Sequence, residues 1–143
     1  CEVNPAEKKG KGLSKLLVCV SSNRETQQHI LRKAARMADF RNAELIALYV
    51  QTTKENNDRI PLDTQRHLMG HLELVVQLGG RIRREVSEDI TQTIIDVCRE
   101  ECVTTLCMGQ PSLTLFRLLN RAGAYRNLLL NLKEISADLV IFA

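Results

Sequence analysis

Three of the apolar runs in this sequence end in, or are followed by, residues that could contact a ligand. In chain order they are Ser21, Ser22, Asn23, Tyr49, Val50 and Gly109. Ser and Asn side chains hydrogen-bond polar ligands, an aromatic ring offers a stacking surface, and a glycine lets a ligand approach the backbone. Each residue type also has a structural use, because Ser and Asn cap helices, a strand Tyr packs in a core, and a Gly lets the chain turn. The residue types alone leave both roles open.

The elements that must position these residues alternate along the chain. Apolar runs predict strands at 16–20, 45–50, 103–108 and 139–142, and alternation of polar and apolar residues predicts a less buried strand near a sheet edge at 81–86. Helical spacing of apolar residues predicts helices at 25–40, from 61 to the glycine pair at 79–80, from 87–89 onward, and at 123–132. This order predicts an α/β fold, a three-layer, doubly wound sandwich with a five-stranded parallel sheet. Ligands of such sheets bind beyond the carboxyl ends of the strands, where the ends of the first, second and fourth strands are expected to meet.

Composition excludes several classes of protein. A chain of 143 residues is expected to be one globular unit, and its net charge of +3 is too small to indicate a nucleic acid partner. Aromatic residues make up only 3%, which argues against a stacking surface for single-stranded nucleic acid. No apolar stretch approaches the roughly 20 residues of a membrane-spanning helix. We expect residues 1–14, which are polar and rich in lysine and glycine, to be a linker, and residues 15–143 to be the domain.

Several short motifs, in their order and spacing, resemble one known family. They are Leu17–Asn23 followed by Leu31–Ala38, then Ala47–Val50, the Gly79–Gly80 helix end and Cys107–Ser112. Together they resemble the universal stress protein domain of the KdpD potassium-sensing histidine kinases, over about Leu16 to Ala143. The resemblance implies the universal stress protein fold, which is similar to that of adenine nucleotide α-hydrolases. It also implies a non-catalytic, cytoplasmic regulatory domain in two-component potassium or osmotic signalling, with the other domains of an inner-membrane-anchored parent kinase, or a second copy, as partners.

The resemblance also implies where a nucleotide would bind. ATP-binding members carry Gly-x2-Gly-x9-Gly-Ser/Thr after the fourth strand. Here Gly109 keeps the first glycine, Ser112 replaces the second, and Gly123 arrives one residue late, followed by Ala124. Glycines let backbone amides approach phosphate oxygens, and a helix N-terminus adds free N–H groups. Ser112 narrows that approach, and Ala124 removes one hydroxyl donor.

A second motif points to cyclic di-AMP. Some KdpD stress-protein domains bind it through Ser-x-Ser after the first strand and Phe-Thr-Ala-x-Tyr at the second, which Ser21–Asn23 and Leu45–Tyr49 match in part. The resemblance thus implies an adenine nucleotide, cyclic di-AMP or ATP, as the ligand. The implied nucleotide-binding residues are Ser21, Ser22, Asn23, Tyr49, Val50, Gly109, Ser112, Gly123 and Ala124. The alternatives are a free-standing, ATP-binding stress protein that forms a homodimer, and an adenine-nucleotide hydrolase, for which no paired nucleophile and base is evident.

Two further clusters have simpler interpretations. His67 and His71 lie at i, i+4 without an evident third ligand, so we expect a solvated surface pair and no metal site. Arg81, Arg83 and Arg84 form a basic cluster around Ile82, in which Arg81 and Arg83 share one face of the strand, and this favours a solvated strand at the edge of the sheet. A docking surface for an acidic partner domain is the alternative for these arginines.

The cysteine pattern is not that of a disulfide framework. There are five of them, mostly inside apolar runs, which is typical of reduced thiols in the cytosol. Cys98 and Cys102 are spaced i, i+4, unlike the Cys-x-x-Cys pair of redox proteins. We expect Cys98, on the apolar stripe of its helix, to pack as a small hydrophobic residue.

Overall fold

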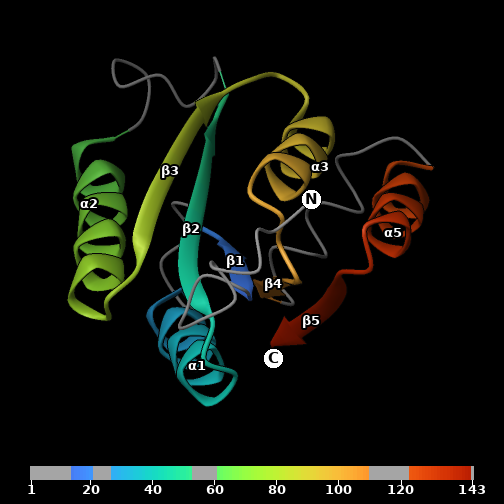
Figure 1. The fold of residues 1–143 in the computed structure, drawn as a ribbon. Coiled ribbons are helices and arrows are strands. Elements are labelled where there is room, and N and C mark those ends of the chain that lie inside the picture. Colours follow the sequence, from blue (N-terminus) through green and yellow to red (C-terminus); the bar gives the residue numbers. More distant parts are fainter. Residues whose placement is uncertain (1–13, 21–26, 53–60, 110–122, 143) are drawn as a thin grey trace.

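A computed structural model of the chain describes residues 14–20, 27–52, 61–109 and 123–142. Nine elements follow one another there. They are β1 (Lys15–Cys19), α1 (Gln27–Phe40), β2 (Glu44–Gln51), α2 (Leu62–Gln77), β3 (Arg81–Val86), α3 (Ile90–Glu100), β4 (Thr105–Gly109), α5 (Ala124–Glu134) and β5 (Asp138–Phe142). The predicted order of strands and helices is therefore confirmed (Figure 1).

The five strands form one parallel sheet in the order β3-β2-β1-β4-β5. The helices α1 and α2 cover one face of this sheet, and α3 and α5 cover the other (Figure 1). The predicted three-layer, doubly wound α/β architecture is thus confirmed. The arginine-rich strand β3 lies at one edge, as its weaker apolar pattern predicts.

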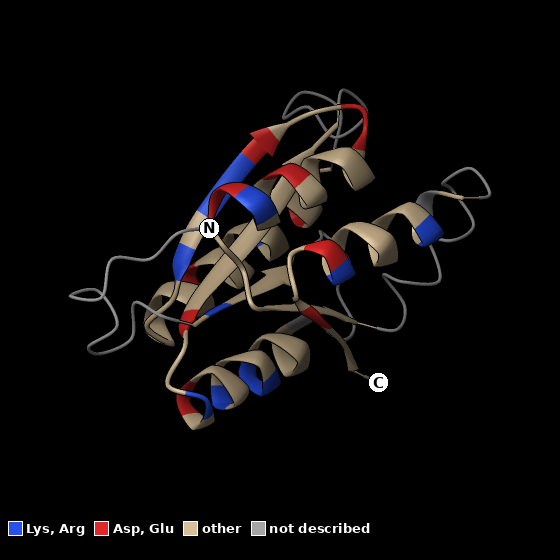
Figure 2. Ribbon diagram, turned by 45° about the vertical axis from the view of Figure 1, so that its right-hand side comes forward, with Lys and Arg blue, Asp and Glu red and all other residues tan. Residues whose placement is uncertain are grey.

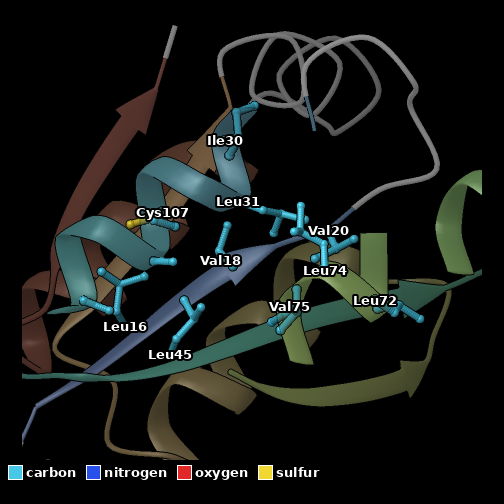
Figure 3. Close-up of a cluster of buried hydrophobic side chains, with 14 of the residues drawn as sticks. Leu16, Val18, Val20, Ile30, Leu31, Leu45, Leu72, Leu74, Val75 and Cys107 are labelled. Atoms are coloured by element: carbon cyan, nitrogen blue, oxygen red, sulfur yellow. The ribbon is translucent and has the colours of Figure 1, made fainter. Parts of the chain in front are cut away.

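The core consists of two clusters, one on each face of the sheet. Successive strand residues point to opposite faces, so Leu16 and Val18 of β1 join the cluster under α1 and α2, whereas Leu17 joins the cluster under α3 and α5. Figure 3 shows the first cluster, in which Leu31 of α1 and Val75 of α2 meet these strand residues. Burial on both faces explains why the central strands are continuous apolar runs rather than alternating ones.

Local signals account for most element ends. The Asp89 side chain accepts a hydrogen bond of 3.0 Å from the Gln92 N–H and caps the first turn of α3. Asn42 (φ 52°) follows α1 and Gly79 (φ 84°) follows α2, and both adopt the left-handed conformation that ends a helix. The predicted fourth strand begins two residues late, at Thr105. The Val103 N–H donates instead to the Cys98 carbonyl and closes the end of α3.

The amino ends of three strands are tied to α3 by a network of ion pairs. Arg81 of β3 donates two hydrogen bonds to Glu101 (3.2 and 2.7 Å) and a third to Glu44 (3.0 Å). Arg83 also donates to Glu101 (3.1 Å) and pairs with Glu100. Figure 2 shows these basic residues along β3 beside the acidic end of α3. The arginines are thus neutralised by residues of the same chain, which favours the structural interpretation over a surface for an acidic partner.

Two sequence predictions are wrong in part. His71 is only 1% exposed, because it lies on the inner face of α2 next to Leu72, so His67 and His71 are not a solvated pair. Cys102 is disulfide-bonded, so the expectation of five reduced thiols fails at this residue. Cys102 lies half-buried in the left-handed turn after α3 (φ 57°), outside the apolar runs.

Among the described residues, none of the helices is both long enough and apolar enough to span a bilayer.

Candidate nucleotide-binding site

The strand order creates a switch point between β1 and β4. From β1 the chain moves outward through β2 to the β3 edge, whereas from β4 it moves to the β5 edge, so the crossover helices lie on opposite faces. Val18 pairs with Cys107, which brings the ends of these two strands to within one residue of the same level. The crossover helices therefore diverge where β1 and β4 end, which is the place where ligands of such sheets bind.

Gly109 lies at this switch point, as predicted. It is the last residue of β4, is buried, and pairs with Phe142 of the edge strand β5. By the register of Val18 with Cys107, it stands level with Val20, the residue after β1. A residue without a side chain at this place leaves the backbone open to a close approach.

Gly123 lies at the same edge of the sheet, because α5 runs antiparallel to the strands that it connects. It precedes α5 with φ 115°, a conformation that side chains disfavour, and its carbonyl accepts the first helical hydrogen bond, from Asn127 (2.8 Å). A glycine cannot cap the helix with a side chain, and no acidic residue occupies the first turn of α5. N–H groups at the start of a helix are suited to an anion. Ala124 is the first residue of α5.

Tyr49 and Val50 end β2 but serve opposite faces. Tyr49 is 2% exposed and packs in the cluster under α1 and α2, whereas half-buried Val50 packs on the α3 side. The Arg84 guanidinium carbon lies 5.8 Å from the centre of the Tyr49 ring, a cation–π contact. Tyr49 therefore packs in the core, which is the structural role that the sequence analysis left open for a tyrosine in a strand. Stacking of a purine on this ring stays a prediction.

Sequence reasoning missed the contact of Arg84 with Tyr49. It placed Arg81 and Arg83 on one face of the strand, and Arg84, the next residue, points to the opposite face. The register places Arg84 directly beside Tyr49. The alternation of side chains could be read from the sequence, whereas the register of β2 with β3 could not.

The remaining candidates, Ser21, Ser22, Asn23 and Ser112, lie outside the described residues. Their segments, 21–26 and 110–122, leave from the ends of β1 and β4, the two strands that form the switch point. The structure thus places Gly109, Gly123 and the end of β2 at one edge of the sheet. For the four polar residues, the nucleotide-binding role stays a prediction.

Two thiols are inert because they are buried in the core. Burial raises the pKa of Cys98 and of Cys107 to about 12, so both are protonated near neutral pH and are poor nucleophiles. Cys98 is fully buried on α3, which confirms its predicted role as a small core residue. Among the described residues, no three His, Cys, Asp or Glu side chains are grouped so that they could hold a metal ion.

Comparison with solved structures identifies the fold. The universal stress protein of Archaeoglobus fulgidus in complex with dAMP is 12% identical, with a TM-score of 0.60, over 91% of this chain and 98% of that one. A universal stress protein family member from Burkholderia pseudomallei is 17% identical, with a TM-score of 0.58, over 93% and 98%. A universal stress protein in complex with cAMP is 15% identical, with a TM-score of 0.58, over 90% and 94%.

The chain therefore has the universal stress protein fold, which confirms the fold that the sequence motifs imply. No protein-family model matches the sequence, and comparison with curated proteins gives no significant match.

Proposed function

We propose that this chain is a regulatory domain of the universal stress protein type that binds an adenine nucleotide where β1, β2 and β4 end. The observation that carries the proposal is that Gly109 ends β4 at the switch point, while Gly123 precedes α5 at the same edge of the sheet. Solved proteins with this fold include complexes with dAMP and cAMP. Glycine backbone and helix N–H groups would receive the phosphate, and the segments after β1 and β4 would contact the base and sugar.

The finer proposal places the domain in a KdpD-like sensor histidine kinase. Its support is the set of sequence motifs from Leu17–Asn23 to Cys107–Ser112. In that setting the domain would be cytoplasmic and would bias the kinase through its nucleotide or through contacts with neighbouring domains. The domain itself would carry out no reaction, so incubation with ATP should release no ADP.

A free-standing, ATP-binding stress protein is the second candidate. It is favoured by the comparison in which this chain spans 98% of the length of the Archaeoglobus fulgidus protein, so a chain of this size can be a whole stress protein. The coding sequence on either side of this segment discriminates between the two. Membrane helices and a kinase core support the sensor kinase, whereas start and stop codons at the ends of the segment contradict it.

The binding proposal is tested by calorimetric titration of the chain with cyclic di-AMP, ATP and cAMP. We expect at least one of them to bind, and Ser21→Ala to weaken binding because a hydroxyl partner is lost. The matched control is Ser14→Ala, which changes a serine at the opposite end of β1 and should bind like the unmodified protein. If none of the three nucleotides binds, or if both variants bind unchanged, the nucleotide site is wrong as assigned.

A further inference from the structure

The helix α2 presents apolar side chains to solvent on the face turned away from the core. Leu62 is 62% exposed, Met69 54% and Val76 60%. These residues are seven positions apart, nearly two helical turns, so they form one line along the helix. The opposite face of α2 is buried through Leu68, His71, Leu72, Leu74 and Val75. The buried face makes the core contacts of α2, so the three exposed apolar residues, here called the α2 stripe, are not explained by packing within the chain.

An apolar groove runs beside the α2 stripe. Its volume is about 460 Å³, and its apolar walls are Met69, Leu72 and Val76 of α2 and Ile82 of β3. The strand β3 is an edge of the sheet, so the groove opens at the side of the molecule. The groove can receive side chains of a partner that packs along α2.

The charges flanking the α2 stripe identify the partner. Arg66 and Glu73 are exposed, also seven residues apart, and lie on the same flank of the stripe. Within the part of the chain that the structure describes, neither forms an ion pair, in contrast to Arg81 and Arg83. The residue types along the α2 stripe are arranged symmetrically about its middle. Met69 is at its middle, with an apolar residue seven positions away on each side, and the two opposite charges stand at about equal distances from this middle.

We infer that the α2 stripe binds the α2 stripe of a second copy of this chain, antiparallel, around a two-fold axis beside Met69. In such a pair the same surface meets itself, so that a contact from one residue to another occurs twice. Met69 then faces Met69 of the partner, Leu62 packs near the partner's Val76, and Arg66 lies opposite the partner's Glu73. In this arrangement the spacing of the residues allows two Leu62–Val76 contacts and two Arg66–Glu73 contacts to form together.

The interface is expected to be modest. A helix of 16 residues is about 24 Å long, and even with the adjoining groove it offers less than the roughly 800 Å² per partner of a standard interface. The dimer should therefore dissociate on dilution. We expect it not to depend on nucleotide binding, because the α2 stripe lies on the face of α2 that is turned away from the sheet, whereas Gly109 and Gly123 lie at β4 and α5.

The test is sedimentation velocity of the full chain over a range of concentrations. We expect a concentration-dependent dimer. Met69→Asp should give a monomer, because it places two carboxylates at the two-fold axis. Glu73→Arg should raise the dissociation constant about tenfold, since two like-charge contacts replace two attractive ones. The double variant Arg66→Glu, Glu73→Arg restores opposite charges and should return to the dissociation constant of the unmodified chain.

Circular dichroism and thermal unfolding of each variant confirm that the exposed substitutions leave the fold intact. A chain that stays monomeric at its solubility limit contradicts the inference. So does a dimer that survives Met69→Asp, or a double variant as weak as Glu73→Arg alone. The last two results would assign the dimer to another surface. Nucleotide titration of Met69→Asp separates the two proposals, because loss of the dimer should leave nucleotide affinity unchanged.

Discussion

The two ends of the sheet are built from different groups. At the amino end, Glu101, the residue after α3, accepts from Arg81 and Arg83 of β3 and lies 3.6 Å from the Lys15 ammonium of β1, and Arg81 also pairs with Glu44 of β2. At the carboxyl end, the described residues of the switch point offer backbone, through Gly109 and Gly123. The most conspicuous charges of the sequence are thus used by the fold itself, and the end left open for a ligand is marked by glycines.

The largest effect is expected at the amino end. Glu101→Ala removes the shared acceptor of Arg81 and Arg83, so it should lower the free energy of unfolding by about 2 kcal/mol, the scale of hydrogen bonds to charged groups. Urea denaturation measures this. The control is Glu134→Ala, which removes a single exposed pair with Arg99 and should cost about 0.5 kcal/mol or less. Equal effects of the two variants would contradict the special role of Glu101.

At the carboxyl end, Gly123→Ala should cost about 1 kcal/mol, because φ 115° strains any residue with a side chain. It should also weaken adenine nucleotide binding by shifting the start of α5. Gly70→Ala is the matched control, since an added methyl meets nothing within 4 Å at either position and Gly70 has ordinary helical geometry. That control should stabilise the protein by about 1 kcal/mol. Thermal unfolding should show a lower stability for Gly123→Ala and a higher one for Gly70→Ala. If both variants change stability in the same direction, backbone conformation at Gly123 is not the cause.

A smaller effect is expected from the pH dependence of the network. Hydrogen bonds from Arg81 lower the pKa of Glu101 from 4.5 to about 2. A carboxylate with a lowered folded-state pKa stabilises the protein above its unfolded-state pKa, and this contribution is lost as the pH falls from about 4.5 toward 2. Glu101→Gln should therefore flatten the decline in unfolding free energy over that window. Parallel curves for the variant and the unmodified protein would show that Glu101 is not held in this way.

The smallest effect concerns Arg84, which belongs to neither end. Its contact with the Tyr49 ring should contribute about 0.5–1 kcal/mol. Arg84→Ala should therefore destabilise the protein less than Arg83→Ala, which removes ion pairs with Glu85, Glu100 and Glu101. Urea denaturation of both variants ranks them. If Arg84→Ala destabilises the protein more than Arg83→Ala, the face of β3 on which an arginine lies does not determine its contribution to stability.

Much of the fold could be predicted from the sequence because its signals are local and agree with one another. Continuous apolar strands such as Leu16–Val18 require cover on both faces, and Asp89 and Gly79 mark helix ends by their own chemistry. His71 shows where this reasoning stops. Its spacing from His67 suggests a shared face, but the exposed arc of α2 depends on how the helix packs against β2 and β3.

For the candidate site, the sequence predicts the location in the fold but not the contacts between side chains. Parallel strands bring their carboxyl ends to one edge, so the locations of Gly109 and Gly123 followed from element order. The partners of Arg81, by contrast, come from β2 and α3, up to 37 residues away in sequence. Such contacts depend on register and on the path of α3 across the sheet, which residue spacing along one strand does not encode.

The most direct test of the account is an amide chemical-shift titration of the ¹⁵N-labelled chain with cyclic di-AMP and with ATP. The account predicts that the amides of Val50, Gly109 and Gly123 shift with a common affinity. The amides of Glu44, Arg81 and Asp138, at the amino ends of their strands, should stay unchanged. Shifts confined to the amino end, or no shift with either nucleotide, would contradict the claim that the switch point binds an adenine nucleotide.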